Sequence, residues 1–181
     1  PSDAEALRTY GYFLVSDGRF QQAIEHYRKA LEVDPMQVRA YFGLAMTLIL
    51  AGRFEDLPEL TERLASHRDE QFMQRWNRNI GLMTLRYKGL YAELIEVLPE
   101  NPEPLGDLQD AAVAYYHTGN EQRAREYLDQ MIEIANERSD DFSEVAAVFA
   151  QMNQPDRAIE YLEKAMQARE VNFAFIRVDP D

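Results

Sequence analysis

The sequence predicts an all-α protein built as an array of similar helix pairs. The segment GRFQQAIEHYRKALEVDP (Gly18–Pro35) returns near the C-terminus as QPDRAIEYLEKAMQ (Gln154–Gln167), which places Ala23 and Ala158 in register 135 residues apart. A further copy, NEQRAREYLDQMIE (Asn120–Glu133), has its alanine 34 residues before Ala158. A constant period of this size indicates a repeat array. The composition agrees, because glycine and proline number only eight each and helix formers dominate.

The first unit of the array contains two helical patterns. In the segment of about Ala4–Ser16, apolar and small residues recur at a 3-1-3 spacing that gives one face: Leu7, Tyr10, Gly11 and Leu14. The Asp17-Gly18 pair interrupts the pattern, and a second helix is predicted over about Phe20–Val33. Its inner face holds Phe20, Ala23, Ile24, Tyr27, Ala30 and Leu31. Asp34 ends this helix, since a residue before proline avoids helical geometry. The small residues Gly11 and Ala23 are expected to let the two helices approach closely.

These positions resemble the tetratricopeptide repeat family. The match rests on Leu7, Gly11, Leu14, Gly18, Ala23, Tyr27, Ala30 and Pro35. At the same spacing, five repeats are predicted near residues 4–37, 38–69, 70–103, 104–138 and 139–170. Pro58 departs from the pattern in the second repeat, and the third can be anchored on either Gly81 or Gly89. The resemblance implies ten antiparallel helices stacked into a right-handed superhelical solenoid.

The tail VNFAFIRVDPD (Val171–Asp181) is a shorter apolar pattern, predicted to form a helix that caps the last repeat. The alternative is that it starts the next segment. It resembles the tails of such arrays in bacterial winged-helix regulators, nucleotide cyclases and kinases. Because the chain begins at Pro1 rather than Met, we expect it to be a piece of a larger bacterial protein.

Few residues in the sequence suggest catalysis or metal binding. The absence of cysteine excludes disulfides, thiolate metal sites and a cysteine nucleophile. The three histidines fall in different repeats, and none has the i, i+4 spacing of a helical zinc pair. His67-Arg68-Asp69 spells the start of a kinase catalytic loop, but Gln74 stands where that loop has asparagine. We therefore predict no enzymatic activity, no cofactor and no metal.

An acidic cluster marks the start of the predicted fifth repeat. Glu137, Asp140, Asp141 and Glu144 lack the spacing of a calcium-binding loop. Asp140 and Asp141 are instead predicted to cap and charge the start of the helix that follows.

Charge and hydropathy restrict the kind of partner. The formal net charge of −13 argues against binding to nucleic acid or anionic lipid, including recognition of RNA in a basic groove. The longest apolar run, Tyr41–Gly52, is shorter than the roughly 20 residues that a membrane-spanning helix needs. The compartment is left open, with the cytoplasm favoured over the periplasm. The sequence indicates another protein as partner.

In a solenoid of helix pairs, the first helix of each pair lines the concave side. The residues predicted there as partner contacts are Arg8, Tyr12, Arg39, Phe42, Met46, Trp76, Met83, Arg86 and Tyr116. Aromatic, methionine and arginine side chains are enriched at protein interfaces. The alternative for each residue is packing against the neighbouring helix. The arginines also make the N-terminal part of this surface locally positive.

The predicted function is a scaffold that binds a peptide or helix of another protein, possibly with acidic groups, in its concave groove. A clamp for a C-terminal carboxylate is not expected, because the amide that such clamps use is replaced by Tyr12 and Gly43. Two alternatives stay open. One is a sensory or regulatory arm of a larger signalling protein, and the other is a structural module that assembles with itself into a homo-oligomer.

Overall fold

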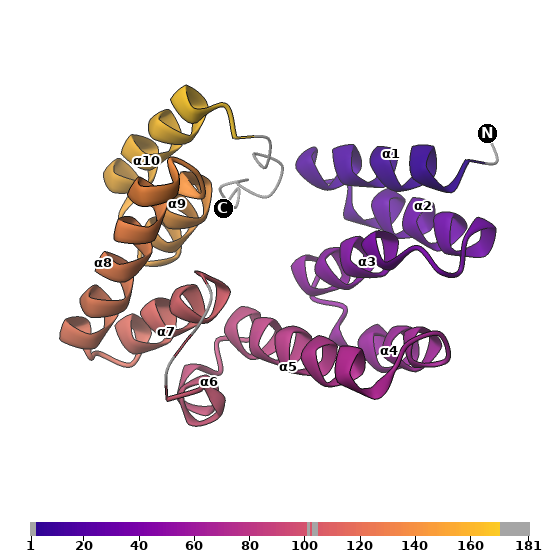
Figure 1. Ribbon diagram of the computed structural model, residues 1–181, viewed down its shortest axis with the longest axis horizontal. Coiled ribbons are helices and arrows are strands. Elements are labelled where there is room, and N and C mark those ends of the chain that lie inside the picture. Colours follow the sequence, from indigo (N-terminus) through magenta and orange to yellow (C-terminus); the bar gives the residue numbers. More distant parts are fainter. Residues whose placement is uncertain (1–2, 101, 103–104, 171–181) are drawn as a thin grey trace. The chain divides into compact units, whose positions relative to one another are not determined.

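A computed structural model describes residues 3–100, 102 and 105–170 (Figure 1). The predicted capping helix over 171–181 lies outside these residues. The part described consists of helices and contains no strand. The elements are α1 (Ala4–Ser16), α2 (Phe20–Val33), α3 (Val38–Leu50), a 3-10 turn (Phe54–Asp56), α4 (Leu57–Ala65), α5 (Glu70–Tyr87), α6 (Tyr91–Val97), α7 (Leu105–His117), α8 (Glu121–Arg138), α9 (Phe142–Gln151) and α10 (Pro155–Ala168). The prediction of an all-α helical repeat is confirmed.

The turns between paired helices share one construction. A residue with positive φ follows each first helix of a pair, at Gly18, Gly52, Gly89, Gly119 and Asn153. The amide of the next residue then donates back into the helix, as from Arg19 to Leu14 O (2.8 Å) and from Gln154 to Phe149 O (2.9 Å). This is the Schellman arrangement, which glycine favours because it has no Cβ to clash. In the third repeat Gly89 takes this position, whereas Gly81 lies inside α5.

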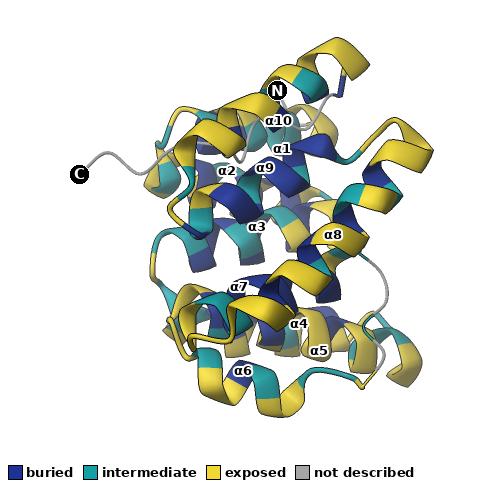
Figure 2. Cartoon of the chain, turned by 90° about the vertical axis from the view of Figure 1, so that its left-hand side faces the viewer, coloured by how far each residue is buried: buried dark blue, intermediate teal, exposed yellow. Residues whose placement is uncertain are grey.

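Every long helix buries one side and exposes the other (Figure 2). The chain divides into two compact units, Pro1–Tyr87 and Lys88–Asp181, called here the N-terminal and C-terminal units. The N-terminal unit contains α1 to α5, and the C-terminal unit contains α6 to α10. Each unit has a hydrophobic core of its own. The repeat boundaries given above stay a prediction.

The second repeat departs from the first in its outgoing helix. A 3-10 turn over Phe54–Asp56 precedes α4, and Pro58 stands in the first turn of that helix. Proline is tolerated there because the amide it lacks would have no partner within the helix. As a result α4 has nine residues, whereas α2 has fourteen.

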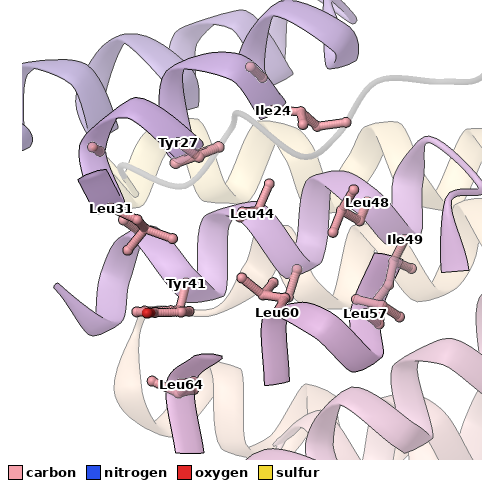
Figure 3. Close-up of a cluster of buried hydrophobic side chains, with 14 of the residues drawn as sticks. Ile24, Tyr27, Leu31, Tyr41, Leu44, Leu48, Ile49, Leu57, Leu60 and Leu64 are labelled. Atoms are coloured by element: carbon pink, nitrogen blue, oxygen red, sulfur yellow. The ribbon is translucent and has the colours of Figure 1, made fainter. Parts of the chain in front are cut away.

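Tyr27 lies at the centre of the N-terminal core. Its side chain, on the side of α2 that faces α3, is only 2% exposed (Figure 3). Glycines on both neighbouring helices make room for its ring. A Cβ atom built on Gly11 of α1 would lie 3.2 Å from the ring, and one built on Gly43 of α3 would lie 2.5 Å from Cε1. The expectation that Gly11 allows close approach is therefore met, and Gly43 has the same role with less room to spare.

We expect Gly43→Ala to destabilise the protein. Overpacking a core costs about 1–3 kcal/mol. Alanine's better helix propensity returns roughly 1 kcal/mol. Gly81→Ala is the matched control, because no atom lies within 4 Å of the added methyl group. Gly81→Ala should raise the free energy of unfolding, measured by chemical denaturation, while Gly43→Ala lowers it. Equal stabilisation by both changes would show that the Tyr27 ring can move aside.

In the C-terminal unit, α9 begins with an unexpected cap. The carboxylate of Glu170, which is 9% exposed, accepts hydrogen bonds from the backbone amides of Phe142 (2.7 Å) and Ser143 (2.9 Å). Asp141 is the residue before the helix, but its side chain makes no capping bond. The prediction that Asp140 and Asp141 cap this helix is therefore wrong. The carboxylate comes instead from a residue that follows α10, because the packing of α10 on α9 brings it there.

Candidate binding surfaces

Five of the predicted contact residues lie in the N-terminal unit on the packed helices α1 and α3. We call them the α1–α3 face: Arg8, Tyr12, Arg39, Phe42 and Met46. Phe42 is 46% exposed and Arg39 is exposed, whereas Tyr12 and Met46 are half-buried. Arg8 and Phe42 are one repeat apart, as are Tyr12 and Met46, so the two helices present equivalent sides. The surface therefore carries aromatic and thioether groups on helices whose opposite sides are fixed in the core.

The two arginines of this face are not equivalent. Arg8 donates from Nε to Oε2 of Glu5 (3.0 Å) and from Nη2 to Oε1 (2.5 Å). The hydrogen bond from Arg8 is the main cause of the lowered pKa of Glu5, and the charges of Arg8 and Arg39 act in the same direction. Gln37, just before α3, also donates to Glu5 (3.2 Å). The charge of Arg8 is thus balanced within α1, while Arg39 has no ion pair among the residues that the structure describes.

Trp76 is a buried residue of α5 and not an exposed contact. Its side chain is 6% exposed, belongs to the N-terminal core and donates from Nε1 to Oγ1 of Thr61 on α4 (3.1 Å). Ile80, one turn later, is buried on the same side of the helix. The placement of Trp76 on an open groove is therefore wrong. The indole fills space beside the short helix α4.

The other predicted contacts on α5 are also largely enclosed. Arg86 is 6% exposed, and its guanidinium lies 5.3 Å from the centre of the Tyr87 ring. Met83 is half-buried against the N-terminal core. Neither residue offers the exposed side chain that was expected, because α5 is packed along much of its length.

Tyr116 belongs to the C-terminal unit and is described apart from the α1–α3 face. Its half-buried ring meets His117 edge-on at 5.4 Å. His117 also stacks on Tyr91 at 4.3 Å, and its Nε2 lies 2.9 Å from the carbonyl oxygen of Gln151. The histidine therefore joins three helices of this unit through packing and hydrogen bonding.

An apolar groove between α4 and α5 was not predicted. Its volume is about 700 Å³, and its lining comprises Phe54, Leu57, Pro58, Thr61, Glu62, Ala65, Met73, Asn77, Ile80, Gly81, Thr84 and Leu85. A sequence signal for it exists. Pro58, Thr61 and Ala65 stand one repeat after Ile24, Tyr27 and Leu31, and these smaller side chains leave open the space that α2 fills.

A smaller cavity of about 310 Å³ lies in the C-terminal unit, lined by residues of α6, α7, α8 and the loop after α6. On its wall the Tyr115 and Tyr127 rings stack with centres 5.7 Å apart. Arg123 donates from Nη1 to the hydroxyl of Tyr115 (2.8 Å), and its pKa is raised chiefly by this hydrogen bond.

Two kinds of site were sought in the described part of the chain. Over residues 3–100, 102 and 105–170, no group of three or more histidine, aspartate or glutamate side chains is arranged to hold a metal ion. Within the same ranges, no helix has the length and apolar character required to cross a membrane.

Comparison with known proteins gives matches at both ends of the chain. A family model described as TPR repeat matches residues 11–49, and another described as tetratricopeptide repeat matches residues 145–172. Over 85 residues the chain is 27% identical to the tetratricopeptide repeat-containing protein trd-1 of Caenorhabditis elegans. That match covers 47% of this chain and 11% of the relative, so the chain spans about a tenth of the relative's length.

A solved structure is also similar. It is described as YrrB, a TPR protein with an unusual peptide-binding site. The likeness covers 97% of this chain and 91% of that one, at 17% identity and a TM-score of 0.43.

Proposed function

Since this chain is a tetratricopeptide repeat protein, we propose that it is a protein-interaction scaffold whose α1–α3 face binds a peptide or helix of a partner. The observation that supports the proposal is the half-exposed Phe42 ring beside Tyr12 and Met46. Aromatic anchors contribute most of the affinity at protein interfaces, since they bury much area with few rotatable bonds. Methionine adds a side chain that adapts its shape to the ligand.

The rigidity of the two helices adds to this argument. On the opposite side of α1 and α3, Leu14, Leu44 and Leu48 are at most 3% exposed in the shared core. A surface held in place before binding loses less conformational entropy when the ligand docks. The proposed site is therefore preformed, and the chain supplies no chemistry of its own.

Charge sets the proposed orientation of the ligand. Arg39 is the exposed cation of the face, whereas Arg8 is held by Glu5. In a molecule with a net charge of −13, a local positive group favours acidic ligand residues at that point and disfavours them elsewhere. An acidic side chain of the partner should therefore lie beside Arg39.

The experiment is a titration of a partner captured from the native host against three variants. Phe42→Ala should weaken binding by about 2 kcal/mol, a factor near thirty. Arg39→Ala should lower the association rate and the dependence of affinity on salt. Glu59→Ala, an exposed change on α4, should bind normally.

Circular dichroism of all three variants is the control for folding. Phe42 is 46% exposed, so its truncation should leave the helical signal unchanged. Normal binding by folded Phe42→Ala, together with weak binding by Glu59→Ala, would place the site elsewhere and contradict the proposal.

A further inference from the structure

The first helix has an apolar side that nothing covers in the described chain. On α1, Tyr10 is 47% exposed and Phe13 is 63% exposed, with Ala6 exposed on the same side. Their equivalents one repeat later, Leu44 and Thr47, are 3% and 0% exposed. We call Ala6, Tyr10 and Phe13 the α1 edge. It is the side on which a preceding helix would pack.

The same positions are buried in every other repeat where the register is clear. In α9 they are Val145 and Val148, and in α7 they are Ala111 and Ala114, all of them at most 1% exposed. The exposure of the α1 edge therefore follows from its place as the first helix described, and its apolar character matches helices that do have a neighbour.

The last described helix shows the complementary feature. On α10, Ile159 is 56% exposed, Met166 is 67% exposed and Leu162 is half-buried. Their equivalents 135 residues earlier are Ile24, Tyr27 and Leu31 of α2, which are at most 2% exposed because α3 packs on them. We call Ile159, Leu162 and Met166 the α10 edge.

We propose that the chain associates head to tail, with the α10 edge of one copy packed on the α1 edge of the next. Inside the chain the equivalent sides of α2 and α3 already bury each other, so the contact between copies would continue an interface that the fold contains. Such a contact is heterologous, and it forms rings or open chains rather than closed two-fold dimers.

The sizes of the side chains agree with this pairing. Between α2 and α3, the large Tyr27 ring requires glycine at position 43. Between copies, the equivalent pair is the smaller Leu162 with Thr9, where glycine is not needed. Phe13 replaces the smaller Thr47 and restores volume on the same face. The two edges therefore keep the total volume of the internal interface while exchanging which side is larger.

Charges at the rim are also complementary. Arg28 of α2 pairs with Asp56 (3.2 Å), and Arg53 binds the same carboxylate. Shifted by the register, Arg28 becomes Glu163 and Arg53 becomes Arg19, both exposed. The internal contact between an arginine and an aspartate is thus replaced between copies by a glutamate facing an arginine.

Head-to-tail contact leaves the α1–α3 face open. Arg8 and Tyr12 lie on the opposite side of α1 from Tyr10 and Phe13, since residues two apart on a helix point in opposing directions. The proposal therefore does not depend on the proposed function.

The test is sedimentation velocity of the 181-residue chain over a concentration series, where species larger than a dimer are expected to grow with concentration. Phe13→Asp blocks the α1 edge and Met166→Asp blocks the α10 edge. Each variant alone should be monomeric, while an equal mixture should form a one-to-one dimer and nothing larger. Phe42→Asp, a change of similar exposure off both edges, should associate like the parent.

A second pair of variants tests the register. Glu163→Arg should weaken association through repulsion from Arg19, and the double change with Arg19→Glu should restore it. These surface changes also cover the case in which an aspartate variant fails to fold. A monomeric parent chain at all concentrations, association by Met166→Asp alone, or no rescue in the double variant would each overturn the proposal.

Discussion

Replacing Tyr27 with alanine is expected to lower the free energy of unfolding by about 3–5 kcal/mol, the range for large aromatic truncations in a core. The side chain is 2% exposed and contacts both α1 and α3 through Gly11 and Gly43. Neither glycine has a side chain that could move into the space left by the ring. The cavity would therefore persist, and its cost adds to the lost apolar burial.

The matched control is Tyr87→Ala, at the end of α5, where the ring is 40% exposed. Surface truncations of this kind change stability by about 0.5 kcal/mol. Urea denaturation followed by circular dichroism measures both variants. A loss below about 1 kcal/mol for Tyr27→Ala would show that the helices close over the cavity and that Tyr27 is not central to the core.

Raising the pH above 10 is expected to destabilise the protein by about 2–3 kcal/mol through Tyr27 alone. Burial raises the pKa of Tyr27 from 10.0 to about 12, with the positive charge of Arg8 opposing the shift. The folded state therefore holds the phenol proton at pH values where the unfolded chain has lost it. The stabilisation is complete below pH 10 and is lost as the pH rises from 10 to 12.

Tyr27→Phe isolates this effect from the other titrating groups. The two proteins should lose stability at different rates between pH 9 and 11, and the variant should be less sensitive. The measurement is the denaturation midpoint at each pH. Parallel curves for the two proteins would mean that the Tyr27 hydroxyl ionises as readily in the folded state as in the unfolded chain.

The helix pairs were predictable because their signals are local. The structure has α1 at Ala4–Ser16 and α2 at Phe20–Val33, the ranges that apolar spacing and the Asp-Gly and Asp-Pro breaks predict. A turn residue and the residues one helical turn away lie within a few positions of each other. The repeat period then extends the same prediction along the chain.

The candidate site was predictable in part. The helix register correctly placed Phe42 and Arg39 on an exposed side of α3, because a side that faces away from the core has polar and large apolar groups at fixed spacing. The same rule failed for Trp76. The third repeat offered two registers, and the helix before it was shortened around Pro58. Binding by these residues stays a prediction.

The sequence alone established the all-α repeat, its period and its turn chemistry, since each depends on residues within about 34 positions of one another. Contacts between segments decided the rest. The division at Tyr87, the groove between α4 and α5, and the cap that Glu170 places on α9 depend on which helices pack together and how closely. A periodic pattern shows which side of a helix is apolar, but the space beside that side depends on the size of side chains on its neighbours.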